Sequence, residues 1–179
     1  MDISVVGAGH VGLVTGACFA DLGHDVVIVD NDVKRIANLK KGVMPYYEPG
    51  LSELVRRGVR ERRLAFTTSL KEAVGKTTII FIAVGTPQKA TGEADLAYVE
   101  NVARSIAEHL PGYRLVVEKS TVPVQTGQWI AHTIKTYLKK KHPFDVASNP
   151  EFLREGTAIR DFMKPDRVVL GVESARAKE

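Results

Sequence analysis

The most constraining feature of the sequence is a glycine-rich turn between a short apolar run and a helical stretch. The apolar run covers residues 1–6, and the turn that follows it is Gly7-Ala8-Gly9-His10-Val11-Gly12. The helical stretch continues to Leu22, and a second apolar run over residues 26–29 ends on Asp30. Strand, glycine turn, helix, strand and terminal acid in this order are typical of a dinucleotide-binding unit. The sequence therefore predicts a dinucleotide site near its amino terminus.

Each glycine of this turn has its own steric role. Gly7 permits the tight turn, Gly9 leaves room for a pyrophosphate, and Gly12 lets the helix pack closely on the sheet. Backbone N–H groups and the dipole at the start of the helix attract the phosphates. We expect the Asp30 carboxylate to accept hydrogen bonds from the adenosine ribose. A turn that merely connects two elements is the alternative, and the flanking strands, helix and acid argue against it.

Strand-like and helix-like segments alternate along the rest of the chain. We expect strands at residues 64–67, 78–84, 115–117, 145–147 and 167–171. Helices are expected at 32–41, after 51, after 69, at 95–110 and at 123–138, with a capping box at Ser69 and Glu72 and Pro123 in the first turn of the last helix. No internal repeat or linker interrupts this alternation. It predicts one Rossmann-like α/β domain over residues 1–179, doubly wound, with a mostly parallel sheet and helices on both faces.

The composition is that of a soluble globular protein, with 44% hydrophobic and 26% charged residues. No stretch approaches the ~20 apolar residues of a membrane span. Asp2 stands where a signal peptide has basic residues, so we expect no membrane association and a cytoplasmic location. The single cysteine, Cys18, excludes a disulfide framework, and no metal site is expected. It lies in the helical row Val11, Val14, Cys18 and Leu22, which predicts a buried structural thiol.

The chain is basic, with a formal net charge of +4 and a pI of about 9.2. The basic residues cluster at 56–63 and at 139–141. Neither cluster has the interleaved aromatic side chains on which bases stack, so we expect a solvated helix face and no nucleic-acid partner. Such a surface also attracts small anionic ligands.

Polar residues follow four of the expected strands at the point where each strand ends. They are the glycine turn, Gly85-Thr86-Pro87, Ser120-Thr121 and the segment 149–155. Because the carboxyl ends of parallel strands share one edge of the sheet, these groups can converge on one ligand. Thr86 or Ser120 capping the next helix, and Glu151 as a solvated carboxylate, are the alternatives for single positions.

The same stretches carry a resemblance to a known family. They contain, in order, VGAGHVGLVTGACFADLGHDV, PYYEPGL, VGTP, EKSTVPV, SNPEFLREGTAIRDF and PDRVVLG. This series resembles the N-terminal domain of the UDP-glucose/GDP-mannose dehydrogenase family over nearly the whole chain. The resemblance implies NAD as the cofactor and UDP-glucose as the substrate, oxidised to UDP-glucuronate with two NAD. GDP-mannose or UDP-N-acetylmannosamine as the substrate, another NAD(P) enzyme such as a hydroxyacid dehydrogenase, and a free-standing NAD-binding module are the alternatives.

The resemblance also assigns roles to single residues. Contacts to NAD are implied for Gly7, Gly9, Val11, Gly12, Asp30, Arg35, Thr86, Ser120 and Glu155. Thr121 and Glu151 match catalytic positions that act on a water or on the substrate hydroxyl. The edge of the substrate site is implied for Glu151, Phe152, Leu153 and Glu155. One departure bears on the start of the following helix, because Gln125 stands where the family usually has glycine.

The family holds its aldehyde intermediate on a cysteine thiolate, which is both a strong nucleophile and a good leaving group. That cysteine, with a lysine and an asparagine that stabilise developing charge, lies in a second domain of the family. We therefore expect this chain alone to bind NAD and to form no NADH. The full-length enzyme is expected to be a homodimer or a larger assembly, with its dimer contacts largely outside this chain.

Overall fold

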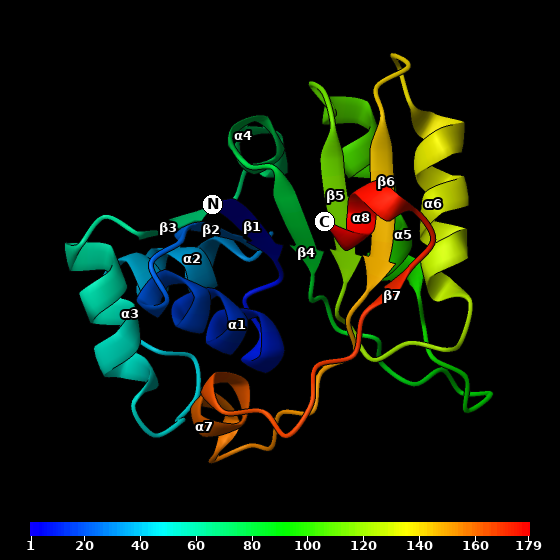
Figure 1. Cartoon of the computed structure of the whole chain (residues 1–179). Coiled ribbons are helices and arrows are strands. Elements are labelled where there is room, and N and C mark those ends of the chain that lie inside the picture. Colours follow the sequence, from blue (N-terminus) through cyan, green and yellow to red (C-terminus); the bar gives the residue numbers. More distant parts are fainter.

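A seven-stranded β-sheet runs through the centre of the structure, a computed structural model that describes residues 1–179 (Figure 1). Its strands are β1 (Asp2–Val6), β2 (Asp25–Val29), β3 (Leu64–Thr67), β4 (Ile79–Ile82), β5 (Arg114–Glu118), β6 (Phe144–Ser148) and β7 (Gly171–Val172). The spatial order is β3-β2-β1-β4-β5-β6-β7. The first six strands are parallel, and only β7 pairs with its neighbour in the antiparallel sense. The predicted doubly wound, mostly parallel α/β fold is confirmed.

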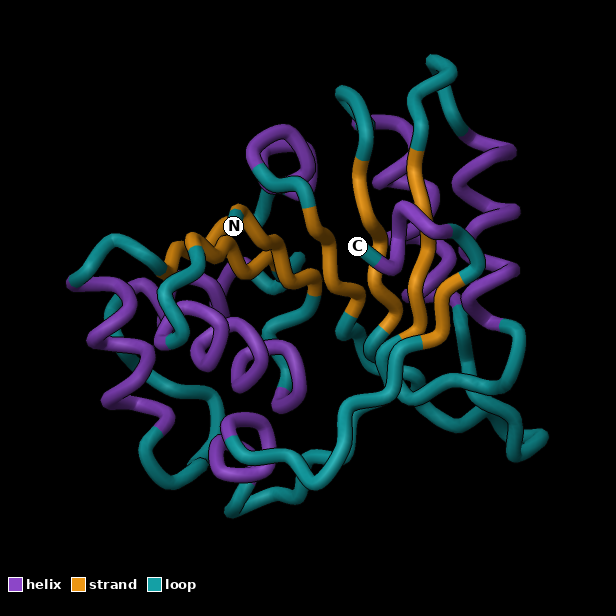
Figure 2. The backbone as a smooth tube through the Cα atoms, in the orientation of Figure 1, coloured by secondary structure: helices purple, strands orange, loops and turns teal.

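Helices connect the strands and cover both faces of the sheet (Figure 2). They are α1 (His10–Asp21), α2 (Val33–Lys40), α3 (Leu51–Arg60), α4 (Leu70–Lys76), α5 (Ala97–His109), α6 (Thr126–Tyr137), α7 (Ala158–Met163) and α8 (Ala175–Lys178). Helix α1 packs against α3, β2 and α7, whereas α5 packs against α4 and α6. None of these helices is long and apolar enough to cross a membrane.

Two hydrophobic clusters form the core, one on each face of the sheet. In β4, Phe81 belongs to the cluster that includes α1 and α3, whereas Ile80 and Ile82 belong to the cluster that includes α5 and α6. This division follows from the strand geometry, because successive side chains of a strand point to opposite faces. An apolar strand such as β4 is therefore buried on both sides, as is typical of a parallel sheet.

The prediction of a last strand over residues 167–171 is wrong. Only Gly171–Val172 forms a strand, and its register pairs Gly171 with Ser148 and Val172 with Ala147. Val168 and Leu170 have no neighbouring strand and are 65% and 62% exposed. A β-branched run favours extended backbone, but it forms a strand only where a partner lies beside it.

Three local predictions also need correction. Helix α6 begins at Thr126, so Pro123 precedes the helix, and the N-cap Gln125 has a left-handed φ of 73°. Leu22 is 54% exposed and leaves the core-facing row, because it follows the end of α1. At α4, Ser69 caps the Glu72 N–H as predicted, but the Glu72 carboxylate accepts from Thr67 and Lys76 and makes no reciprocal bond to Ser69.

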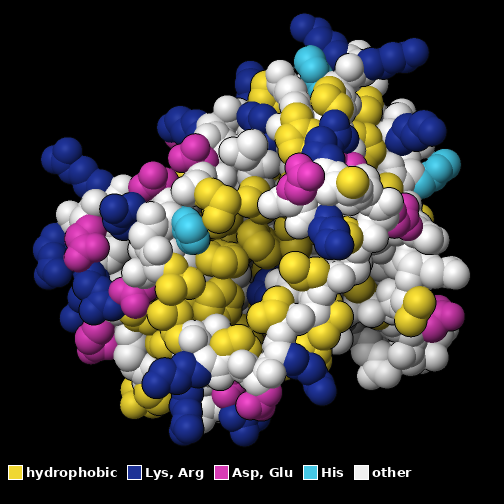
Figure 3. All heavy atoms as spheres, in the orientation of Figure 1, with side chains coloured by type: hydrophobic (Ala, Val, Ile, Leu, Met, Phe, Trp, Pro, Cys, Tyr) yellow, Lys and Arg dark blue, Asp and Glu magenta, His cyan; other side chains and the backbone are white.

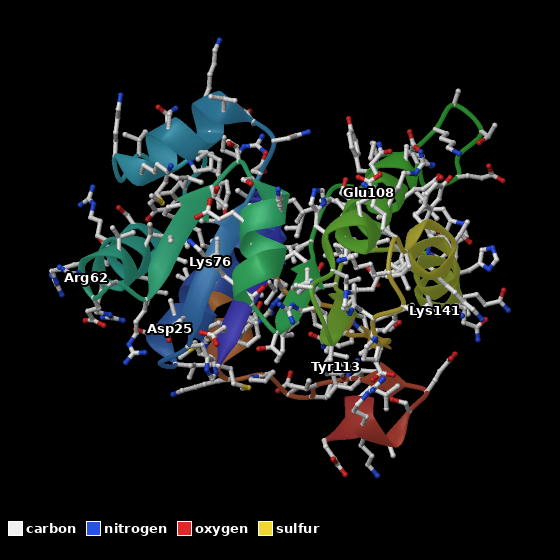
Figure 4. All side chains as sticks on the ribbon, turned by 90° about the horizontal axis from the view of Figure 1, so that it is seen from above. Asp25, Arg62, Lys76, Glu108, Tyr113 and Lys141 are labelled. Atoms are coloured by element: carbon white, nitrogen blue, oxygen red, sulfur yellow. The ribbon has the colours of Figure 1, made fainter.

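The strands begin at the edge of the sheet opposite their carboxyl ends, and Figure 4 shows this edge from above. Its labelled residues lie in or beside the connections that lead into the strands, and they are Asp25, Arg62, Lys76, Glu108, Tyr113 and Lys141. Arginines of the 56–63 cluster lie at the surface, and Arg57 and Arg63 form ion pairs with Asp21 and Asp25. None of the candidate site residues lies at this edge, since all follow the carboxyl ends of the strands.

Candidate functional site

The glycine turn packs tightly against β4 and leaves one side open. Gly7 has a φ of +110°, and a Cβ there would lie 2.3 Å from the Ala83 carbonyl oxygen. A Cβ on Gly12 would lie 2.0 Å from the Gly7 carbonyl oxygen. A Cβ on Gly9 would meet no atom within 4 Å, and Gly9 is exposed at the N-cap of α1. The turn thus presents open space beside the first N–H groups of a helix, which fits a pyrophosphate.

Asp30 is held at the end of β2 with only 8% of its surface exposed. Its carboxylate accepts hydrogen bonds from the Ala8 N–H at 2.8 Å and the Asp32 N–H at 2.9 Å. The Arg35 guanidinium donates a further bond of 2.9 Å to Oδ2. A carboxylate has about four acceptor positions, so this arrangement leaves capacity for a ribose hydroxyl. The acid and the glycine turn are directly joined, as a dinucleotide site requires.

The ends of β4 and β5 are linked through three of the predicted site residues. The Thr86 hydroxyl donates to the Thr121 carbonyl oxygen at 2.7 Å, and the Ser120 hydroxyl donates to the Ile82 carbonyl oxygen at 3.3 Å. The Ser120 N–H also donates to the Ile82 carbonyl oxygen. Ser120 is buried, whereas Thr121 is exposed at the edge of the sheet. The structure therefore brings Thr86, Ser120 and Thr121 together.

The carboxyl edge of the sheet also has a cavity of about 470 Å³. It lies between the segment 149–154, the segment 164–168 and two aromatic rings. The rings are Phe19 of α1 and Phe162 of α7, which meet edge to face at 5.1 Å. Figure 3 shows that this side of the molecule is hollowed and that hydrophobic side chains line the hollow. Glu151, Phe152 and Leu153 all line the cavity, and the Leu153 N–H donates to the Glu151 carboxylate. Charged and polar side chains line the cavity beside these apolar ones, which suits a polar small molecule.

Among the predicted site residues, Glu155 and Val11 are the least fixed by the surrounding structure. Glu155 is exposed, and its side chain makes no hydrogen bond. Val11 lies half-buried in the first turn of α1. Val11 lies two residues after the open Gly9, and Glu155 directly follows the cavity segment 149–154.

Lys119 is a cavity residue that the sequence analysis did not single out. It is only 5% exposed, and its Nζ donates to the Asn149 Oδ1 at 3.0 Å and lies 5.9 Å from the Phe162 ring centroid. Burial lowers the pKa of Lys119, although the charges of Glu151 and Glu118 act in the opposite direction. Lys119 belongs to the motif EKSTVPV, but the sequence alone does not show which side chain at the end of a strand faces a cavity.

Glu118 precedes Lys119 and faces the other side of the sheet. It is 3% exposed, and its Oε1 has no hydrogen-bond partner. Burial raises the pKa of Glu118 to about 7, although the Ser120 backbone and the Lys119 charge favour the ionised form. A charged carboxylate oxygen that is buried without a hydrogen-bond partner is costly, which favours the protonated form of Glu118.

Cys18 is fully buried, and burial followed by the charge of Asp21 raises the pKa of its thiol to about 12. A thiol in that state holds almost no thiolate at neutral pH, and thiolate is the reactive form. The prediction of a buried structural thiol is confirmed.

Glu48, in the loop between α2 and α3, was also missed. The loop contains the PYYEPGL stretch, and the sequence predicts no separate role for its acid. Its Glu48 is 4% exposed, and the carboxylate accepts hydrogen bonds from the N–H groups of Gly156 and Ala158 and from His10. Its partners lie up to 110 residues away in sequence, so no local pattern could reveal them.

Comparisons with known proteins agree with this geometry. The model of the UDP-glucose/GDP-mannose dehydrogenase family, NAD binding domain, matches residues 1–179. The chain is 51% identical over 175 residues to the UDP-glucose 6-dehydrogenase TuaD of Bacillus subtilis, covering 98% of this chain and 38% of that protein. It is 53% identical over 182 residues to the UDP-glucose 6-dehydrogenase of Rhizobium meliloti, covering 100% of this chain and 41% of that protein.

Solved structures show the same likeness. A UDP-glucose dehydrogenase from Pyrobaculum islandicum superimposes with a TM-score of 0.95 at 45% identity, over 98% of this chain and 41% of that chain. A GDP-mannose dehydrogenase from Pseudomonas aeruginosa superimposes with a TM-score of 0.94 at 38% identity, over 99% of this chain and 42% of that chain. This chain therefore spans about two fifths of the length of the relatives it matches. From its first residue to its last it matches one NAD-binding domain, and it belongs to the UDP-glucose/GDP-mannose dehydrogenase family.

Proposed function

We propose that this chain is the cofactor-binding domain of a dehydrogenase that oxidises UDP-glucose to UDP-glucuronate with two NAD. The observation that carries the proposal is the single edge of the sheet at which the open glycine turn, the linked ends of β4 and β5 and the Glu151 cavity meet. The names of the relatives with about 50% identity favour UDP-glucose as the substrate. A GDP-mannose dehydrogenase among the structural relatives makes GDP-mannose the nearest competitor.

Most residues of the proposed cofactor site lie in the amino-terminal half of the chain. Gly7, Gly9 and Gly12 form the phosphate turn, with Val11 beside it. Asp30 binds the adenosine ribose, and Arg35, which is paired with Asp30, also contacts NAD. The open space beside Gly9 and the remaining acceptor capacity of Asp30 support this assignment. Thr86 and Glu155 complete the proposed NAD contacts, with Ser120 near the nicotinamide side. When bound there, NAD supplies the acceptor for the hydride that leaves the sugar.

The proposed catalytic residues are Thr121 and Glu151. As the hydride leaves C6 of the sugar, the C6 hydroxyl must lose its proton, and a carboxylate within hydrogen-bond reach can take it directly or through a water. Glu151 lines the cavity together with Lys119, and its charge acts to keep that lysine protonated. Thr121 supplies a hydroxyl that orients the water or the substrate hydroxyl. Phe152, Leu153 and Glu155 form the proposed substrate edge with Glu151.

The test is the formation of NADH, followed by absorbance, in the whole protein that carries this chain. Glu151→Gln should slow the reaction by about 10²–10⁴-fold, as loss of a general acid–base group does. UDP-glucose should be preferred to GDP-mannose. An unchanged rate in the Glu151 variant refutes the catalytic assignment, and a preference for GDP-mannose refutes the substrate assignment.

The 179-residue chain alone should bind NAD and yet form no NADH. Hydride transfer requires the reacting atoms to be held about 3–3.5 Å apart in an aligned pose, and we assign part of that alignment to the second domain of the family. Cys18 does not replace the family's nucleophilic cysteine, because its thiol is buried in the core behind the glycine turn. Steady NADH production by the isolated chain with UDP-glucose would contradict this proposal.

A further inference from the structure

A single buried carboxylate, Glu48, joins the glycine turn to the segment that follows Glu155. Its Oε2 accepts from His10 Nε2 at 3.0 Å and from the Gly156 N–H at 2.8 Å. Its Oε1 accepts from the Ala158 N–H at 3.0 Å. The side chain of Glu48 is 1% exposed, so these three donors take the place of water.

The electrostatics of this contact favour an ionised Glu48. Burial disfavours the charged form, but the hydrogen bonds from His10, Gly156 and Ala158 outweigh it and hold the pKa of Glu48 below its ordinary value. An ionised carboxylate only accepts hydrogen bonds, so the His10 Nε2 carries the proton and donates it. His10 is itself fixed by Tyr46, whose ring packs 5.0 Å away and whose hydroxyl donates to the His10 carbonyl oxygen at 3.2 Å.

The position of these partners in the chain gives the contact its significance. His10 is the first residue of α1 and follows the open Gly9. Gly156 follows Glu155 and has a φ of +87°, and Ala158 begins α7. The residues 151–156 form no helix or strand, so their placement depends on contacts of this kind. Glu48 thus connects the residue that follows the open Gly9 to the segment that follows Glu155.

We propose that Glu48 is a positioning residue that couples the glycine turn to the segment 155–158, so that NAD at the turn and the order of that segment stabilise each other. This rests on the proposed function, because the coupling acts on NAD bound at the turn. A single coupling free energy links NAD binding at the turn to the order of the segment 155–158, so a change in either one must change the other. NAD binding should therefore slow amide exchange at Gly156 and Ala158.

The first test is Glu48→Gln in the 179-residue chain. Glutamine keeps the size, but it has one carbonyl oxygen and an NH₂ group that faces a backbone N–H, so at least one bond is lost. NAD should bind about tenfold more weakly, and the Gly156 and Ala158 amides should exchange faster and lose their response to NAD. The matched control is Asp145→Asn, near the start of β6 and away from the carboxyl ends of the strands. The Asp145 carboxylate also has three partners, which are Tyr113, Ser174 and Arg176. This control should change the NAD dissociation constant by less than about twofold.

A second pair of variants leaves the Glu48 bonds to Gly156 and Ala158 intact, so folding is protected. His10→Ala should weaken NAD binding about threefold and abolish the NAD response of both amides, and His10→Gln, which keeps an N–H donor, should restore both. The proposal is overturned if Glu48→Gln binds NAD as the wild type does, if Asp145→Asn weakens binding equally, or if the amides respond to NAD in His10→Ala. A wild-type chain that does not bind NAD overturns the proposed function and the coupling together, whereas failure in the variants alone overturns only the coupling.

Discussion

Replacement of Gly9 by alanine should separate cofactor binding from folding. Gly9 has φ −76° and ψ −171°, an extended conformation that alanine adopts without strain, and its new Cβ would meet no atom within 4 Å. Alanine is a poorer N-cap than glycine, but it also reduces the entropy of the unfolded chain. These effects oppose each other, so the free energy of unfolding should change by less than about 1 kcal/mol.

Binding of NAD should respond very differently to the same substitution. The methyl group would occupy the space through which we expect the pyrophosphate to approach the N–H groups of α1. Hydrogen bonds to a charged group contribute about 1.5–3 kcal/mol each, so the loss of one or two should weaken NAD binding by about 10-fold to 10⁴-fold.

The assay combines calorimetric titration with NAD and urea unfolding, and Gly12→Ala is the comparison. A Cβ on Gly12 would lie 2.0 Å from a backbone oxygen, so that variant should lose about 3 kcal/mol of stability or more. Wild-type NAD affinity in Gly9→Ala, or a loss of stability as large as that of Gly12→Ala, would show that Gly9 does not leave its space for the pyrophosphate.

Two further predictions concern stability. Because burial raises the pKa of Glu118 from 4.5 to about 7, the folded chain binds a proton there that the unfolded chain releases. The contribution of Glu118 is therefore largest below about pH 4.5 and falls by up to about 3 kcal/mol as pH rises to 7. Urea unfolding between about pH 5 and 8 should show this decline in the free energy of unfolding, and the decline should be smaller in Glu118→Gln. Equal declines in the two proteins would contradict the role of Glu118. Gln125→Gly should stabilise the chain by about 0.5–1 kcal/mol, because glycine adopts the left-handed φ of 73° without strain; a lower thermal midpoint would contradict it.

Features set by local patterns were predictable from the sequence. The glycine turn, the α1 helix and the acid at the end of β2 follow from spacing within thirty residues. The carboxyl edge was also predictable, because parallel strands with right-handed crossovers must end together. The resemblance supplied the cofactor and the individual roles, of which the roles stay predictions. The dimeric assembly and the cytoplasmic location also stay predictions.

Features that depend on distant partners were not predictable. The run at 167–171 has strong β propensity, but only Gly171 and Val172 find a neighbour in β6. Glu48 resembles any loop acid until its donors at Gly156 and Ala158 are known. The burial of Lys119 and Glu118 on opposite faces of one strand end likewise depends on what packs over each face. Periodicity locates elements, whereas buried charge depends on the tertiary structure.

The most direct test of the account is a calorimetric titration of the 179-residue chain with NAD and, separately, with NADP. Asp30 is buried beside the glycine turn, and its negative charge would face the 2′-phosphate of NADP. Arg35 is already paired with Asp30, so it does not offset this repulsion. Charge repulsion and lost ribose bonds should make NADP binding about a hundredfold weaker, and Asp30→Ala should weaken NAD binding and narrow that difference. NAD should bind with this preference, and equal or tighter binding of NADP, or no binding of NAD, would overturn the proposed NAD site at the glycine turn.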